Sequence, residues 1–396
     1  MSFLLGVLIF VVALLFSIML HEAGHFVTAK KFGMKVTQFF VGFGQTLWSR
    51  MRGETEYGVK ALPLGGYVKI TGMTALEEVD PADEPRSFRR QPGWQRAIVL
   101  LAGSFMHFLL AFVLLFALAV GIGIQDSTAI GGVDRCVPAS LKAMDTGSCA
   151  GSTTTSPARR AGLRAGDKVI AIDGTPVHNW TQLGDQIRRH PAGRPMRVTV
   201  LRDGRVLTLT ATPSTVPGRG SFLGIEESTA FQTVGPLQGV SFAGSTFGQI
   251  LTGSAAALAH LPSALPDLFA KNRSHTPAGN LSSVVGVADD TGQAVAQGGV
   301  GWETKVWEVL LLIVSLNIFV GAFNLLPLLP LDGGHLAVVI FERIRAWLAR
   351  MFGRPDPGLV DMQKLVPLSV GVFAVLVGLA VLLIAADIVN PVHPFQ

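Results

Sequence analysis

Residues 3–25 read FLLGVLIFVVALLFSIMLHEAGH, an uncharged apolar run that leads directly into two histidines and a glutamate. About 20 apolar residues in a helix are enough to cross a bilayer core of roughly 30 Å. No Lys or Arg precedes the run and no small-residue cleavage site ends it, which is not typical of a cleaved signal peptide. The run therefore predicts a membrane helix that carries His21, Glu22 and His25 at its end.

The composition of the whole chain also indicates a membrane protein. Of its 396 residues, 49% are hydrophobic and only 15% are charged, which is too little polar surface for a soluble globule of this size. Three more stretches, 97–121, 306–326 and 365–388, are long enough to cross a bilayer. We predict a polytopic α-helical membrane protein with about four transmembrane helices.

The distribution of positive charge predicts the orientation of these helices. Lys and Arg are dense between the first and second stretches and recur between the third and fourth, so both connections should be cytoplasmic. Both termini and the long segment between the second and third stretches then lie outside. The net charge of +5 is explained by this orientation and by anionic lipid, so we expect membrane lipid and no nucleic acid as a partner.

The chain divides into five parts by composition and pattern. Residues 1–121 form the first membrane part, in which 36–71 is rich in β-branched and aromatic residues and Gly, and is predicted to form strands. A Gly/Ser/Thr-rich outer linker, 122–156, precedes a compact α+β pattern at 157–212 with a hairpin signal at Arg202-Asp203-Gly204. Residues 213–305 are expected to be a partly ordered connector with an amphipathic stretch at 247–261, and 306–396 form the second membrane part.

The only two cysteines, Cys136 and Cys149, both lie in the outer segment. An oxidising location favours a disulfide between them over two free thiols. Closing so short a loop would contribute about 3 kcal/mol on the loop-entropy model.

The motif His21-Glu22-Ala23-Gly24-His25 predicts a zinc site. A helix puts its two histidines at i and i+4 on one face, where they can bind one Zn²⁺, and places Glu22 as the base that activates water. The alternative is an interfacial cluster of polar side chains. Because two histidines and a glutamate are costly to bury at the end of an uncharged membrane helix, a functional site is favoured.

A catalytic zinc site needs a third protein ligand. Residues 324–335 read NLLPLLPLDGGH, where two prolines and two glycines are expected to prevent a regular helix. The topology brings Asp332 to the cytoplasmic side with His21 and His25, so Asp332 is preferred to His335 and to a simple turn role. Asn324 is expected to donate to the oxyanion of the transition state, a role that does not exclude capping of the broken helix.

These motifs resemble the site-two proteases of regulated intramembrane proteolysis. The resemblance rests on H-E-x-x-H at the end of the first membrane helix, N-x-x-P-x-x-x-x-D-G-G-H on the third, and a PDZ-like insert between the second and third. It closely follows the bacterial four-helix members that cleave anti-sigma factors, and the Ala/Gly/Arg-rich composition suggests an actinobacterial relative. One departure is Ala102-Gly103-Ser104-Phe105-Met106-His107, where many relatives have an Ala-Gly-Pro-x-x-Asn pattern. His107 either hydrogen-bonds to the active site or is a buried histidine.

The resemblance implies an intramembrane zinc metalloprotease of a bacterial inner membrane, with Zn²⁺ as cofactor and its active site towards the cytoplasm. It implies His21, His25 and Asp332 as metal ligands and Glu22 and Asn324 as catalytic residues. Substrates would be single-pass membrane proteins, anti-sigma factors or remnant signal peptides, held extended at a strand edge. The residues expected at that edge are Gly65, Gly66, Tyr67 and Val68.

The PDZ-like segment 157–212 would face a peptide groove with Ala161, Gly162 and Leu163. It could capture a substrate tail, or act as a size filter that admits only trimmed substrates, and the filter is preferred. Two rival functions are a non-catalytic membrane scaffold that binds partner tails and a metal transporter. The intact motif argues against the scaffold, and the gathering of polar residues in one inner pocket argues against the transporter.

Overall fold

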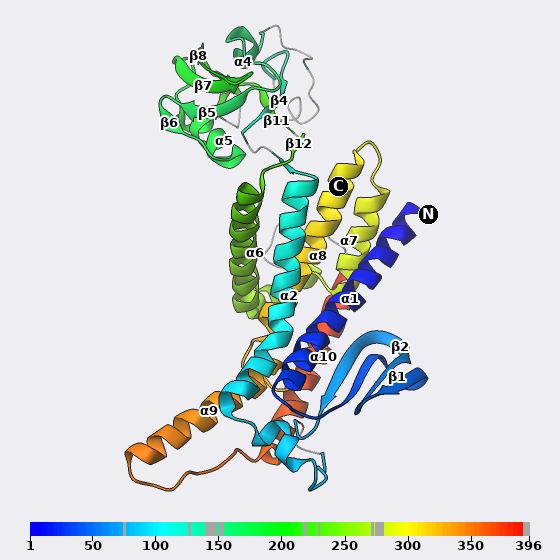
Figure 1. The fold of residues 1–396 in the computed structure, drawn as a ribbon. Coiled ribbons are helices and arrows are strands. Elements are labelled where there is room, and N and C mark those ends of the chain that lie inside the picture. Colours follow the sequence, from blue (N-terminus) through cyan, green and yellow to red (C-terminus); the bar gives the residue numbers. More distant parts are fainter. Residues whose placement is uncertain are drawn as a thin grey trace. The chain divides into compact units, whose positions relative to one another are not determined.

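The computed structural model describes residues 1–73, 77–125, 128–138, 149, 154–216, 220–228, 230–270, 273 and 281–390. The chain separates into two compact units, which are seen in Figure 1. Unit 1 comprises Met1–Leu118 and Gly235–Gln396, and unit 2 comprises Ala119–Val234. Unit 1 is thus built from both ends of the chain.

Among the described residues, four helices of unit 1 are long and apolar enough to cross a membrane, as the sequence predicts. They are α1 (Ser2–Lys31), α2 (Gly93–Gly121), α8 (Trp302–Asn324) and the segment Met362–Val389, most of which is α10 (Val366–Val389). The first continues well past its predicted end at residue 20, and it stops just before Gly33, whose φ of 76° favours glycine. The metal motif therefore lies inside α1 and not at its end.

Helices α1 and α2 approach each other closely at a glycine. A Cβ atom added to Gly24 would lie 2.5 Å from the backbone oxygen of Ala102, so only glycine allows this spacing. Gly24 lies between the two histidines of the motif in α1, and this contact therefore brings α2 beside the metal motif.

Two further helices of unit 1, α6 (Pro236–Ala264) and α7 (Val284–Ala296), occupy the segment predicted to be a partly ordered connector. Helix α6 packs on α2 and α8 through a buried cluster that includes Ala111, Ala243 and Val314, and Figure 1 shows it beside α2. The predicted amphipathic stretch 247–261 lies within α6. Helix α7 packs against α1, where a Cβ on Gly6 would meet the backbone oxygen of Thr291.

The predicted strands at 36–71 are confirmed as a curved pair, β1 (Val36–Arg52) and β2 (Thr55–Ile70). The end of β2 pairs with the start of β1, with Val41 opposite Gly66 and Val36 opposite Ile70. A Cβ on Gly66 would lie 2.5 Å from the sulfur of Met19, so the last residues of β2 lie directly against α1.

Between α8 and α9 (Asp332–Met351) the chain is irregular at 325–331, as its prolines predict. Gly333 and Gly334, however, are helical residues in the first turn of α9. These glycines let the backbone of residues 325–326 pack closely against the first turn of α9, because a Cβ on Gly333 would lie 2.3 Å from the backbone oxygens of Leu325 and Leu326. The glycines thus allow the irregular segment to fold back over the start of α9.

Unit 2 contains a four-stranded sheet with the order β6-β5-β7-β8. Its strands are β5 (Lys168–Ile172), β6 (Thr175–Pro176), β7 (Met196–Arg202) and β8 (Arg205–Ala211). The predicted hairpin is confirmed: Arg202 pairs with Arg205, and Asp203 and Gly204 both have positive φ. Helix α5 (Trp180–Arg189) packs on the core through Leu183 and Ile187.

Short elements complete unit 2. They are α4 (Pro157–Arg160), β3 (Ile124–Gln125), β4 (Ile130–Val133), β9 (Ser214–Val216), β10 (Gly220–Phe222), β11 (Ile225–Glu227) and β12 (Phe231–Gln232). Strand β3 pairs with β12, with Gln125 opposite Phe231, so the chain enters and leaves unit 2 at neighbouring positions. The core also includes Ile130 and Leu223, and it therefore extends beyond the predicted segment 157–212.

Candidate metal centre

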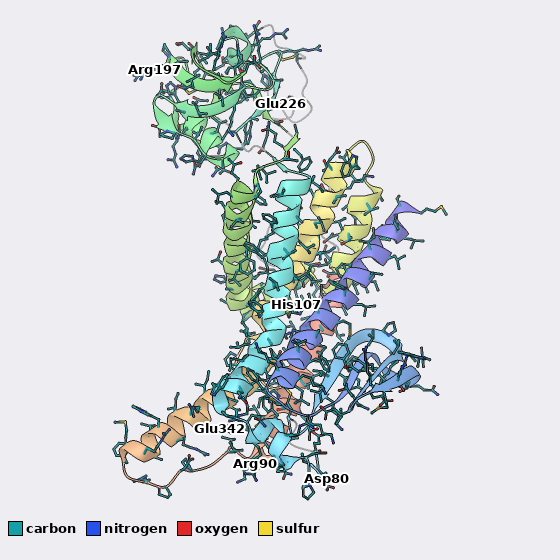
Figure 2. The ribbon with its side chains drawn as sticks, in the orientation of Figure 1. Asp80, Arg90, His107, Arg197, Glu226 and Glu342 are labelled. Carbon is teal, nitrogen blue, oxygen red and sulfur yellow. A yellow bond between two sulfur atoms is a disulfide. The ribbon has the colours of Figure 1, made fainter. Side chains whose placement is uncertain are left out.

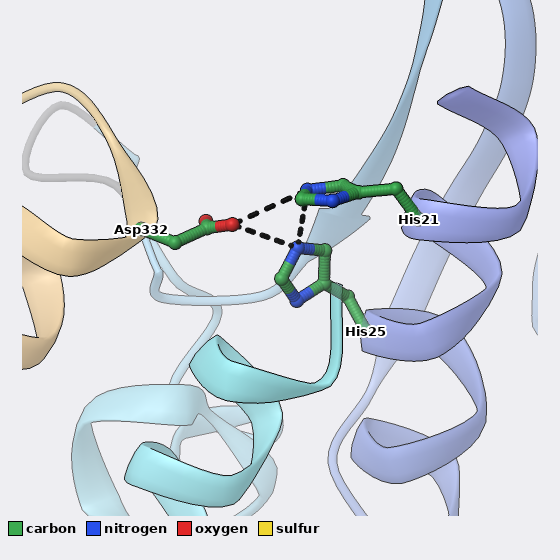
Figure 3. Close-up of side chains that lie close together, drawn as sticks. All are labelled: His21, His25 and Asp332. Atoms are coloured by element: carbon green, nitrogen blue, oxygen red, sulfur yellow. Dashed lines mark hydrogen bonds and ion pairs between the residues drawn. The ribbon is translucent and has the colours of Figure 1, made fainter. Parts of the chain in front are cut away.

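Three side chains from distant parts of the sequence meet at one point in unit 1 (Figure 3). The Nε2 atoms of His21 and His25 lie 3.0 Å apart, and the Oδ2 atom of Asp332 lies 3.2 Å from the first and 3.3 Å from the second. Both histidines are buried and the Asp332 side chain is only 16% exposed. The structure thus brings the three predicted ligands together, and this group does not include His335.

The chemistry of the three atoms fits a zinc ion. The Nδ1 of His25 lies 2.7 Å from the backbone oxygen of Val99, to which it can only donate, so Nε2 of His25 is left as a bare lone pair. The carboxylate of Asp332 faces both Nε2 atoms, and a bound cation would lie between these nitrogens and the carboxylate oxygen. A carboxylate oxygen and two imidazole nitrogens thus converge. Neighbouring ligands around a tetrahedral zinc ion are about 3.3 Å apart, which the observed separations approach.

A glycine of α2 leaves room for the metal. A Cβ on Gly103 would lie 2.4 Å from Nε2 of His25 and 2.6 Å from Nε2 of His21. Any side chain at this position would therefore contact the two ligand atoms themselves. The sequence contains Gly103 within the Ala102–His107 motif, but only the packing of α2 on α1 gives it a role at the metal centre.

The carboxylate of Glu22 is held by the strand β2. Its Oε2 atom accepts a hydrogen bond of 2.9 Å from the backbone N–H of Val68. Of the predicted substrate-binding residues, Gly66 packs on α1, Gly65 has a φ of 151°, and the hydroxyl of Tyr67 donates to Gln38. The end of β2 therefore contacts both α1 and the side chain of Glu22.

His107 and Asn317 form a second buried pair beside the centre. Nδ1 of His107 lies 2.8 Å from Oδ1 of Asn317, and Nδ2 of Asn317 donates to the backbone oxygen of Ile313. The ring of His107 lies 5.0 Å from the ring of His21, and Figure 2 shows His107 midway along α2. The imidazole is thus close to a ligand but outside the group of three. Asn317 has no sequence signal of its own, since it belongs to no motif and is one of several polar residues in a largely apolar helix.

The predicted catalytic asparagine, Asn324, is the last residue of α8 and is partly buried. Within the described part of the chain its side chain makes no hydrogen bond, so the structure leaves its amide available. The irregular segment 325–331 separates it from Asp332.

In unit 2 the residues Ala161, Gly162 and Leu163 lie in a tight turn. Leu163 is buried in the core, and the backbone oxygen of Gly162 accepts from Arg202, which also pairs with the buried Asp167. A cavity of unit 2 lies elsewhere, between α5 and residues 221–225, and is lined by Trp180, Leu183, Ile187, Phe222 and Ile225 among others. Cys136 and Cys149 are joined by a disulfide.

Comparison with known proteins identifies the family. The model of peptidase family M50 matches residues 9–351. The chain is 36% identical to the zinc metalloprotease Rip1 of Mycobacterium tuberculosis and 34% identical to Rip1 of Mycolicibacterium smegmatis, each alignment covering 100% of both chains. It is 28% identical to the metalloprotease MmpA of Caulobacter vibrioides over 86% of this chain and 88% of that protein. Matches of this extent show that the chain belongs to peptidase family M50.

Proposed function

We propose that this protein is an intramembrane zinc metalloprotease that uses His21, His25 and Asp332 as metal ligands and Glu22 as its base. The observation that carries the proposal is the convergence of three ligand atoms within 3.3 Å of one another, next to a glutamate, at buried positions in a membrane unit. Family membership supports the same reaction class and the same metal.

When bound, zinc supplies Lewis acidity, which activates water and polarises the peptide carbonyl that is attacked. Glu22 takes the proton of the attacking water and returns it to the leaving amine. The Val68 N–H holds the Glu22 carboxylate in place for both transfers. The free amide of Asn324 donates to the oxyanion that develops on the substrate.

The substrate must be extended, because a helix uses its backbone carbonyls in internal hydrogen bonds. The edge formed by Gly65, Gly66, Tyr67 and Val68 offers backbone groups for strand addition. Its position supports this role, since Val68 contacts Glu22 and Gly66 contacts α1 next to the ligands. The scissile bond is then held at the same place as the base.

The substrates are single-pass membrane proteins, and anti-sigma factors are the class that the sequence resemblance favours. The active site faces the cytoplasm of a bacterial inner membrane, as the positions of Lys and Arg indicate. Unit 2 is a PDZ-like module outside the membrane. The cavity between α5 and residues 221–225 is its peptide groove, and the turn 161–163, which does not line this cavity, belongs to the supporting core through the buried Leu163.

Replacement of the base tests the mechanism. Purified Glu22→Gln protein should retain zinc and lose peptide cleavage by about a hundredfold or more, because a positioned base contributes at least that factor. His21→Ala, His25→Ala and Asp332→Ala should lose both zinc and cleavage. Zinc is measured by elemental analysis and cleavage with a membrane-inserted substrate in proteoliposomes.

A catalytically idle scaffold that binds partner tails predicts another result. A scaffold would cleave no substrate, whether or not Glu22 is present. The enzyme, by contrast, has a measurable cleavage rate that Glu22→Gln lowers. Full proteolysis by Glu22→Gln would remove Glu22 from the mechanism.

A further inference from the structure

Helix α9 presents its apolar side chains outwards. Ile344, Trp347 and Met351 are 51%, 55% and 62% exposed, and Ile340, Phe341 and Leu348 are exposed as well. Spacings of three and four residues place these positions on one face of the helix. A water-soluble helix has the opposite arrangement, with its apolar face buried against the protein.

The opposite face of α9 is fixed to the protein. Glu342 is buried and its Oε2 atom lies 2.5 Å from the Nη2 atom of Arg96 at the start of α2. Its other oxygen accepts from the backbone N–H of Val360, and Val339 is buried beside the same helix face. Figure 2 marks Glu342 where α9 meets the other helices. This anchor sets the rotation of α9, so the apolar face points away from unit 1.

Three arginines near this face have no carboxylate partner. Arg343, Arg350 and Arg354 are exposed and form no ion pair within the described part of the chain. Arg345, on the other border, donates to the backbone oxygens of Pro357 and Gly358. Long cationic side chains beside an apolar stripe are typical of helices that lie at a membrane surface.

The chain also holds α9 close to one membrane face. Residues 325–331 connect it to the end of α8, and residues 352–361 connect it to the span Met362–Val389. Figure 1 shows α9 extending away from the other helices of unit 1. A helix tethered by two membrane spans and directed away from the bundle has a lipid surface within its reach.

We propose that α9 is an interfacial helix that binds anionic phospholipid. Its apolar face lies at the boundary between acyl chains and headgroups, and Arg343, Arg350 and Arg354 bind the headgroup phosphates. Because Asp332 is the first residue of α9, the lipid surface supports the element that carries a metal ligand. This inference concerns membrane contact alone and does not depend on the proposed catalysis.

Fluorescence of Trp347 tests the position of the apolar face. The full chain is reconstituted in vesicles, and the emission of Trp347 is taken as the difference between wild type and Trp347→Phe. We expect strong quenching by phosphatidylcholine brominated near the top of its acyl chains and little quenching by aqueous iodide. Quenching mainly by iodide would place the face in water, and quenching by neither would mean that a second copy or another protein covers it. Either result overturns the proposal.

The same signal tests the arginines. Brominated phosphatidylglycerol, as a minor component, should quench Trp347 more than the same fraction of brominated phosphatidylcholine, since each engaged arginine enriches anionic lipid by about fivefold. Arg343→Gln/Arg350→Gln/Arg354→Gln should abolish this preference and keep quenching by phosphatidylcholine. The matched control Arg159→Gln/Arg160→Gln/Arg205→Gln removes three exposed charges from unit 2 and should keep it. A preference that survives in the α9 variant, or is lost in the control, contradicts the assigned lipid site.

Discussion

At the scale of single residues, the candidate metal centre has a glycine, Gly103, packed directly against two of its side chains. Gly103 has no side chain, and a Cβ there would lie within 2.6 Å of Nε2 in both His21 and His25. A Cβ contact at that distance requires a shift of the neighbouring atoms, and here the neighbouring atoms are those of the proposed ligands. We therefore infer that the space beside Gly103 is required for the proposed metal site.

Gly103→Ala should therefore weaken zinc binding by at least about tenfold, which is the lower end of the range for changes around metal ligands. The helix should remain, because alanine favours helix more than glycine does. Zinc affinity is measured by competition with a chelator, and helix content by circular dichroism. Gly121→Ala, in the same helix with nothing within 4 Å of its added Cβ, is the control and should bind zinc normally. Equal affinities in the two variants would contradict the steric role.

At the scale of elements, the turn between β1 and β2 is tied to α1. Glu54 in this turn accepts from Arg86 and from Lys30 near the end of α1, and the Arg86 and Lys30 hydrogen bonds lower the pKa of Glu54 from 4.5 to about 2. A lowered carboxyl pKa stabilises the fold above pH 4.5, and this stabilisation is lost as the pH falls towards 2. Exposed pairs of this kind contribute less than about 1 kcal/mol each.

We expect amide protection factors in β1 and β2, corrected for intrinsic exchange, to fall by less than about fivefold as the pH is lowered through this window. Glu54→Gln should show the lower protection already at neutral pH and little further change. Glu78→Gln removes an exposed carboxyl outside this cluster and should behave as wild type. The tether is refuted if Glu54→Gln keeps the full acid dependence.

The sequence predicts some elements far better than others, for physical reasons. The four spans follow from apolar length alone, and the three side chains that meet at the candidate metal centre follow from a short motif and one irregular segment. Helix α6 is uncharged but rich in Gly, Ala and Ser, so its hydropathy is weak although Ala243 packs tightly on α2 and α8. Val68, Gly103 and Asn317 act through contacts between distant elements, which no local pattern contains.

At the scale of the whole molecule, the positions of Lys and Arg fix a testable orientation. Reporters fused at Arg89 or Arg350 should behave as cytoplasmic, and reporters at Arg202 or Val389 as external. Phosphatase and fluorescent-protein fusions give opposite signals on the two sides and check each other. An external signal at Arg89 would invert the model and put the active site on the other face.

Removal of unit 2 separates its two proposed roles. Because Gln125 pairs with Phe231, residues 126–230 can be replaced by a short Gly/Ser linker between neighbouring ends. A size filter predicts that the shortened protein cuts untrimmed substrates, with Glu22 still required, and this is the result we expect. A capture site predicts slower cutting even of trimmed substrates. If the shortened protein inserts stably yet cuts only trimmed substrates at the original rate, neither role survives.

The separation of the ligands along the chain has a consequence for biosynthesis. His21 and His25 emerge from the ribosome early, whereas Asp332 follows only after all of unit 2 and α8 have been made. Chains are made and fold from the N-terminus, so a partly synthesised or truncated product has an incomplete ligand set. We therefore expect metal uptake to be a late step that requires both membrane halves of the chain, and we expect truncated fragments to have no protease activity.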